Sequence, residues 1–105
     1  TAIGNDYDFC KVFSRQIEAK GKIGDTLIAI STSGNSKNVI EAVNTAKNIG
    51  LKTIGLTNND KNNLISKLTD CCIHVPSSST PRVQEAHILI GHMLCEFVEN
   101  ELFGK

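Results

Sequence analysis

The chain has no excess of charge of either sign and no long hydrophobic run. Its 105 residues carry 11 Lys plus Arg and 11 Asp plus Glu, which gives a formal net charge of zero. A neutral balance argues against a nucleic-acid-binding surface and against a basic protein that lies on membranes. No apolar stretch approaches the roughly 20 residues that are needed to cross a bilayer. We therefore expect neither a nucleic-acid partner nor a membrane partner.

Motifs for common cofactors and metals are also missing. The four cysteines, Cys10, Cys71, Cys72 and Cys95, include no C-x-x-C pair, so the zinc-ribbon and thioredoxin patterns are absent. The sequence contains neither a P-loop nor a G-x-G-x-x-G dinucleotide fingerprint. It also has no basic-then-apolar secretion signal at its start. We expect a cytoplasmic protein whose cysteines are reduced.

Two apolar patterns alternate along the chain. Short runs rich in β-branched residues predict strands at Thr26–Ile30, Lys52–Leu56 and Cys71–Val75, and a stub at Thr1–Ile3. Each run is nearly unbroken, as expected for strands buried on both faces of a parallel sheet. Helical spacing predicts helices over Tyr7–Lys20, Ser36–Asn48, Asn63–Leu68 and Thr80–Leu102. This order predicts an α/β fold, a three-layer α-β-α sandwich with a parallel sheet and helices on both faces.

Residues at the ends of these segments add detail. Gly21 and Gly50 are expected to end the first two helices, Thr80 to cap the last one, and Pro81 to take its first position. The polar tract Asn58–Asn63 is interpreted as a surface turn rather than as part of a site. Ligands of open α/β sheets bind at the carboxyl ends of the strands, so the site is expected there.

The segment Ser31–Ser36, with the sequence Ser-Thr-Ser-Gly-Asn-Ser, follows a predicted strand and opens a predicted helix. Four of its six residues carry hydroxyls, and Gly34 permits a tight turn or a close backbone approach. A helix N-terminus offers free N–H groups and partial positive charge to an anion. We interpret the segment as a phosphate site built from neutral donors. The alternative is a loop that only caps its helix, but a cap needs one such residue rather than four.

Polar residues interrupt the last predicted helix. Gln84 and His92 fall on one side of it, with a rise of about 12 Å between them, which favours a shared substrate groove over a metal site. His92 is either an acid/base group that works near neutral pH or a core histidine with satisfied hydrogen bonds. His87 lies on another side of the helix, and we expect it to have a structural or interface role.

These residues also carry a resemblance. Gly24–Asp25 followed by Ile30–Ser36 resembles the phosphosugar-binding loop of sugar isomerase (SIS) domains. Arg82–His87 followed by His92 is similar to the end of bacterial phosphoheptose isomerases, and so is Ile3–Tyr7 followed by Val12–Gln16. The resemblance covers nearly the whole chain but only the C-terminal part of that family. It implies that residues 1–105 form a single, partial SIS domain with a flavodoxin-like fold, without the family's N-terminal helices and first strand.

The resemblance implies an activity and a set of site residues. The activity is the isomerisation of sedoheptulose 7-phosphate to D-glycero-D-manno-heptose 7-phosphate, which supplies heptose for lipopolysaccharide. The family pattern implies a cytoplasmic homotetramer that in many members binds zinc. It assigns the phosphate to Ser31, Thr32, Ser33 and Ser36, and the sugar to Asn5 and Asp6. It assigns substrate and zinc contacts to Gln84, and makes His92 a zinc ligand or the acid/base group.

Parts of the family pattern have no counterpart in this chain. An Asn-Gly-Gly-Ser segment and a helix with a His and a Glu, the expected second base, are missing. Without the family's first strand, two strand edges would lack partners. We therefore expect a fragment of a longer protein, inactive alone, or a chain that partner chains complete. The alternative function is a non-catalytic SIS module that binds a phosphosugar or a replication-initiator protein, but the presence of His92 favours the enzyme.

Overall fold

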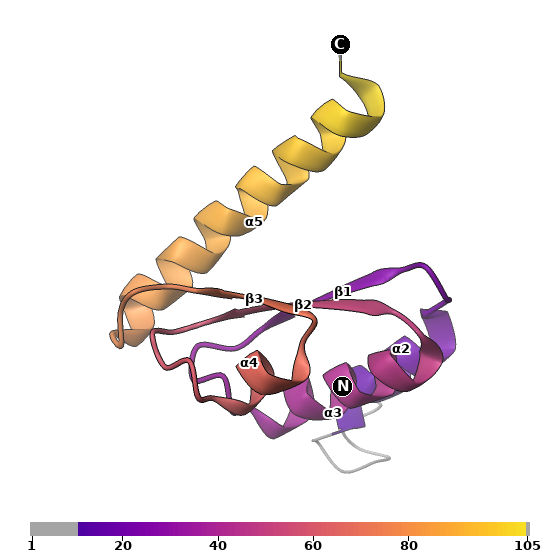
Figure 1. Cartoon of the computed structure of the whole chain (residues 1–105), viewed down its shortest axis with the longest axis horizontal. Helices are drawn as coiled ribbons and strands as arrows, with labels where there is room; N and C mark the ends of the chain where they lie inside the picture. The colour runs from indigo at the N-terminus through magenta and orange to yellow at the C-terminus, as the bar shows by residue number, and fades with distance from the viewer. Residues whose placement is uncertain (1–10, 105) are drawn as a thin grey trace.

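Three parallel strands form the centre of the molecule in a computed structural model, which describes residues 11–104 (Figure 1). The strands are β1 (Thr26–Ile30), β2 (Lys52–Thr57) and β3 (Cys71–His74), in the order β1-β2-β3. The register pairs Ile28 with Ile54 and Leu56 with Ile73. The predicted α/β class and the parallel sheet are therefore confirmed.

Helices lie on both sides of this sheet, as predicted. They are α2 (Val12–Lys20), α3 (Lys37–Ile49), α4 (Leu64–Leu68) and α5 (Thr80–Phe103). Figure 1 shows α2, α3 and α4 on one side, while α5 leaves the opposite side and extends away from the sheet. The third layer is thus a single helix that covers only part of its face.

The apolar core lies between the sheet and the helices α3 and α4. Its buried members are Ala29, Val43 and Ile65. The expected burial on both faces is met by the central strand β2, where Leu56 is completely buried. It is wrong for β1, in which Ile28 and Ile30 are 43% and 51% exposed, because α5 does not extend over them.

Most helix ends follow the sequence signals. Gly21 ends α2, and Gly50 ends α3 with a left-handed φ of 102°, donating its N–H to the carbonyls of Ala46 and Lys47. Ser36 is the N-cap of α3 rather than its first residue. The expectation that Thr80 caps the last helix is wrong. Ser79 is the N-cap of α5, and Thr80 is its first residue.

Two strands differ by one residue from the expected bounds. Strand β2 runs one residue further than expected, to Thr57, and β3 ends one residue earlier, at His74. The stub Thr1–Ile3 and the segment Tyr7–Cys10 lie outside the described residues. Within residues 11–104, the cysteines Cys71, Cys72 and Cys95 are free thiols. In that same range, no helix combines the length and the apolar character that a membrane crossing requires.

Candidate functional site

Three hydroxyl groups converge in the loop between β1 and α3. The Ser31 Oγ lies 2.9 Å from the Ser36 Oγ and 3.5 Å from the Ser33 Oγ. The Ser31 side chain is buried, and its Oγ also accepts the N–H of Gly34 at 3.0 Å. Thr32 is half-buried and forms no hydrogen bond with these three hydroxyls. The loop therefore presents a compact group of neutral donors at the carboxyl end of β1. We call Ser31–Ser36 the serine loop.

The first turn of α3 is open beside these hydroxyls. Ser36, its N-cap, makes no side-chain cap hydrogen bond, because its Oγ is engaged with Ser31 instead. No acidic residue lies in that first turn. The N–H of Val39 in this turn donates to the Asn38 Oδ1 at 2.9 Å. Helix N-terminal N–H groups ahead of it attract an anion through hydrogen bonds and through the helix dipole. The geometry of the serine loop thus suits a phosphate group.

The start of α4 holds the serine loop in place. The N–H of Ile65 donates to the Gly34 carbonyl at 2.9 Å, and the N–H of Leu64 donates to the Asn35 Oδ1 at 3.0 Å. The N-cap of α4 is Asn63, whose Oδ1 accepts the N–H of Ser66 at 2.8 Å. Two segments about 30 residues apart in sequence therefore stabilise each other.

Asn63 is a site residue that the sequence interpretation missed. The tract Asn58–Asn63 was expected to be a surface turn, but Asn63 is only 2% exposed, so that expectation is wrong at this position. Its amide packs directly against Gly34, where an added Cβ would overlap the Asn63 side chain. An Asn directly before a helix is a common N-cap, and this was the available signal. Its contact with the serine loop is tertiary and leaves no local pattern.

The two predicted groups of α5 form no hydrogen bond with the serine loop. Gln84 and His92 are both exposed, and among the described residues neither forms a hydrogen bond with the loop. His92 borders a shallow depression of about 420 Å³ on α5, together with Cys95, Glu96, Glu99 and Asn100. The position of Asn5 and Asp6 lies outside the described residues. The described part of the chain thus contains the predicted phosphate-binding loop. It also contains Gln84 and His92, the two side chains predicted to act on the rest of the sugar.

The described residues do not provide a complete zinc site. Within residues 11–104, no group of three His, Cys, Asp or Glu side chains is placed to hold a metal ion. Gln84 and His92 are eight residues apart on one helix, a rise of about 12 Å, and protein zinc sites need three or four ligands. These two residues alone do not fit the ion.

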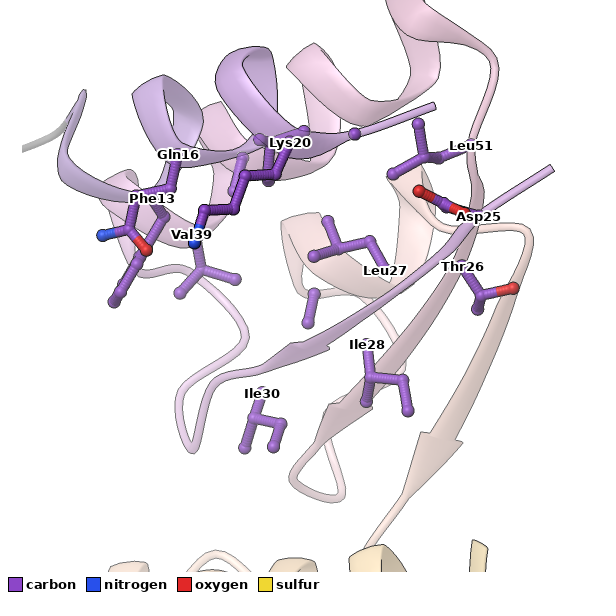
Figure 2. Close-up of a pocket in the computed structure, with 14 residues that line it drawn as sticks. Phe13, Gln16, Lys20, Asp25, Thr26, Leu27, Ile28, Ile30, Val39 and Leu51 are labelled. Atoms are coloured by element: carbon purple, nitrogen blue, oxygen red, sulfur yellow. The ribbon is translucent and has the colours of Figure 1, made fainter. Parts of the chain in front are cut away.

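A separate apolar groove runs along the outer edge of β1. It has a volume of about 600 Å³ and lies between α2 and the strand (Figure 2). Phe13 and Ile17 of α2 line it, together with the whole of β1. Among residues 11–104, none of the predicted site residues borders the groove, so it is distinct from the serine loop.

Comparisons with known proteins agree with this geometry. The family profile described as "SIS domain" matches residues 1–58, which include the serine loop. A phosphoheptose isomerase of Sulfurimonas denitrificans is 54% identical over 99% of this chain and 53% of its own length. A second one, from Campylobacter jejuni, is 53% identical over 100% of this chain and 52% of its own length.

Solved structures are similar in the same way. A phosphoheptose isomerase from Neisseria gonorrhoeae superposes with a TM-score of 0.86 at 47% identity, covering 92% of this chain and 55% of that chain. One from Francisella tularensis superposes with a TM-score of 0.87 at 35% identity, covering 94% of this chain and 55% of that chain. The chain spans about half the length of the curated relatives that it matches. The resemblance that the serine loop indicated is confirmed, and the chain belongs to the SIS domain family.

Proposed function

We propose that the protein to which this chain belongs is a phosphoheptose isomerase that converts sedoheptulose 7-phosphate to D-glycero-D-manno-heptose 7-phosphate. The observation that carries the proposal is the convergence of the Ser31, Ser33 and Ser36 hydroxyls at the start of α3, whose N-cap Ser36 makes no side-chain cap hydrogen bond. Relatives that are 53–54% identical over nearly all of this chain bear the name of that enzyme. Within this proposal the serine loop holds the phosphate end of the sugar, and the reaction takes place at the other end, at C1 and C2.

The serine loop suits a phosphate that must be released again. Hydroxyl and backbone N–H donors bind a phosphate oxygen by charge-assisted hydrogen bonds without the strong attraction of a cluster of cations. The nearest basic residue in sequence is Lys37, the first residue of α3. Substrate and product carry the same phosphate, so uniform binding of that group positions both without favouring either one.

The reaction itself moves protons. A base removes the C1 proton of the ketose and forms an enediol, a proton moves from O1 to O2, and a proton is returned to C2, so that the aldose results. We assign one of these transfers to His92, because an imidazole donates and accepts protons near neutral pH. Gln84 lies on the same helix as His92, and we assign it a hydrogen bond to the sugar. The second base belongs to the part of the protein that this chain does not include.

A zinc ion also belongs to this proposal, with an incomplete ligand set. Where the ion is bound, Gln84 and His92 would contact it, His92 then serving as a ligand in place of its proton transfer, and the remaining ligands would come from outside the described residues. When bound, such an ion polarises a carbonyl and stabilises charge that develops on its oxygen. We assign no proton transfer in this chain to the ion.

We further propose a cytoplasmic homotetramer that acts in the heptose supply for lipopolysaccharide. The support on the structural side is the exposed apolar surface of α5, a helix of 24 residues that extends away from the sheet. Its exposed apolar side chains are Ile88, Leu89, Met93, Phe97, Val98, Leu102 and Phe103. An apolar surface of this kind is typical of an interface between chains. Light scattering of the whole protein should give the mass of four chains, and a monomer would refute this part.

Turnover of the whole protein tests the proposed reaction. The purified protein should convert sedoheptulose 7-phosphate, and His92→Ala should abolish turnover while calorimetry still detects binding of the sugar phosphate.

Ser33→Ala should weaken the binding of the sugar phosphate by about 1 kcal/mol or more, because a hydrogen bond to a charged group is lost.

His74→Ala is the matched control for His92→Ala. Among the described residues, the His74 ring bonds the Ser66 hydroxyl of α4 alone, at 3.0 Å, so turnover should persist. Normal turnover in His92→Ala would exclude the role given to His92.

A further inference from the structure

We propose that His87 is a positioning residue, whose ring fixes α5 against the carboxyl end of β2 and so sets where Gln84 and His92 lie relative to the serine loop. Its effect on catalysis rests on the proposed function, whereas the structural connection does not. His87 is only 4% exposed, and it does not belong to the hydroxyl cluster or to the depression beside His92.

One hydrogen bond carries the connection. The His87 Nε2 lies 3.0 Å from the carbonyl oxygen of Thr57, the last residue of β2. A carbonyl oxygen only accepts, so Nε2 carries a hydrogen and donates it. The same oxygen accepts the N–H of Val75 at 3.1 Å. A single carbonyl therefore joins α5 to the ends of two neighbouring strands.

No other hydrogen bond among the described residues joins α5 to the sheet. The buried side chains of α5 are Val83 and His87. Val83 contributes apolar contact, which has no preferred direction. The bond from His87 is directional, so it fixes both the rotation of the helix about its axis and its position along that axis. Gln84 is three residues before this anchor, and His92 is five residues after it.

The other ring nitrogen indicates that His87 is not explained by packing alone. Its Nδ1 is buried and has no hydrogen-bond partner among the described residues. With the hydrogen on Nε2, Nδ1 is an unpaired acceptor, and burial of such a group lowers stability. A leucine at this position would fill similar space without that cost. The directional bond to Thr57 is what a leucine would lack.

Loss of this bond is expected to affect the chemical step rather than phosphate binding. The serine loop is held by α4, through the bonds to Gly34 and Asn35, and does not depend on α5. Reacting groups that are displaced by about 1 Å lower rates by about 100-fold. A displaced α5 should therefore reduce kcat more than it raises KM, because the phosphate contacts are kept and only the Gln84 contact to the sugar is disturbed.

Three variants of the whole protein separate positioning from folding. His87→Gln keeps an N–H donor at the distance of Nε2, His87→Asn is polar but too short to reach Thr57, and His87→Leu removes the donor. We expect His87→Gln to keep kcat within about threefold of the unmodified protein. We expect kcat to fall at least tenfold in His87→Leu and His87→Asn, with KM within about threefold. The melting temperature of His87→Leu should equal or exceed that of the unmodified protein.

Several results would overturn the inference. Unchanged kcat in His87→Leu would do so, and so would equal losses of kcat in His87→Gln and His87→Asn. If His87→Leu loses activity and its melting temperature also falls, so that the lower stability accounts for the loss, the residue serves folding instead. If His87→Leu does not fold, the comparison of the Gln and Asn variants decides alone.

Two measurements do not need the reaction. The ¹⁵N shifts of the His87 ring should show a protonated Nε2 and a bare Nδ1, and amide exchange at the start of α5 should be faster in His87→Asn than in His87→Gln. The opposite tautomer, or equal exchange, overturns the inference. An unmodified protein that does not isomerise the sugar refutes the proposed function, but these two measurements still decide whether His87 anchors α5.

Discussion

Gly34 is the residue on which the shape of the serine loop depends most directly. Its φ of 73° lies in the left-handed region, and an added Cβ would overlap the amide of Asn63. We predict that Gly34→Ala lowers the free energy of unfolding by about 2–5 kcal/mol, from backbone strain of about 1–2 kcal/mol and overpacking of about 1–3 kcal/mol. Chemical denaturation measures this loss, and phosphate binding should weaken in the same variant.

Gly24→Ala is the matched control for that prediction. Gly24 also has a positive φ, of 96°, but an added Cβ there would meet nothing within 4 Å. It should therefore lose only the strain contribution of about 1–2 kcal/mol. Equal losses in the two variants would show that the contact between Gly34 and Asn63 contributes nothing.

Asp70 is the residue with a clear pH dependence. The backbone N–H of Thr53 donates to its Oδ2 at 2.8 Å and the Thr53 hydroxyl at 3.1 Å, and these bonds hold the pKa of Asp70 below its usual value. Positive charge on Lys52 and Lys47 lowers the pKa further. Because the folded-state pKa is the lower one, the ionised carboxylate stabilises the fold above its unfolded pKa of about 3.9. That contribution is lost as the pH falls through the folded value.

We predict that Asp70→Asn makes the acid part of the stability curve less steep below about pH 4 and lowers stability at pH 7. Urea titrations at a series of pH values measure both changes. Glu99→Gln removes an exposed carboxylate of α5 and should leave the acid slope as it is in the unmodified protein. An Asp70→Asn curve parallel to the unmodified one down to pH 2 would contradict the assignment.

At the scale of helices and strands, local pattern was sufficient for most of the fold. The strands were predictable within one residue because runs of β-branched residues between helical segments are a local signal. The end of α3 was predictable because Gly50 is a residue that adopts the left-handed cap without strain. The cap of α5 was not, since Ser79 and Thr80 are both good caps and only the backbone dihedrals distinguish them.

The features that the sequence did not predict depend on contacts between residues far apart in the chain. The hydroxyl cluster was predictable, because Ser31, Ser33 and Ser36 are close in sequence and follow a strand. The support from Asn63 was not, because its partner Gly34 lies 29 residues earlier. The exposure of Ile28 was also unpredictable, since a run of apolar residues looks the same whether one face or both are covered.

At the scale of the whole molecule, the described residues leave a large apolar surface uncovered. The outer edge of β1 has no partner strand among them, and the groove of about 600 Å³ runs along it (Figure 2). The chain spans about half the length of its curated relatives. A flat apolar edge without a partner is a site where chains associate.

We predict that the 105-residue chain alone self-associates through this edge. Ile30→Lys should raise its soluble concentration and shift its elution toward the monomer, because Ile30 is half-exposed beside the groove and a charge on an edge strand opposes pairing. Size-exclusion chromatography at several concentrations measures the shift. Ile23→Lys is the matched control, since Ile23 is 83% exposed but lies in the loop before β1. Association that Ile23→Lys reduces as much as Ile30→Lys would point to net charge rather than to the edge of β1.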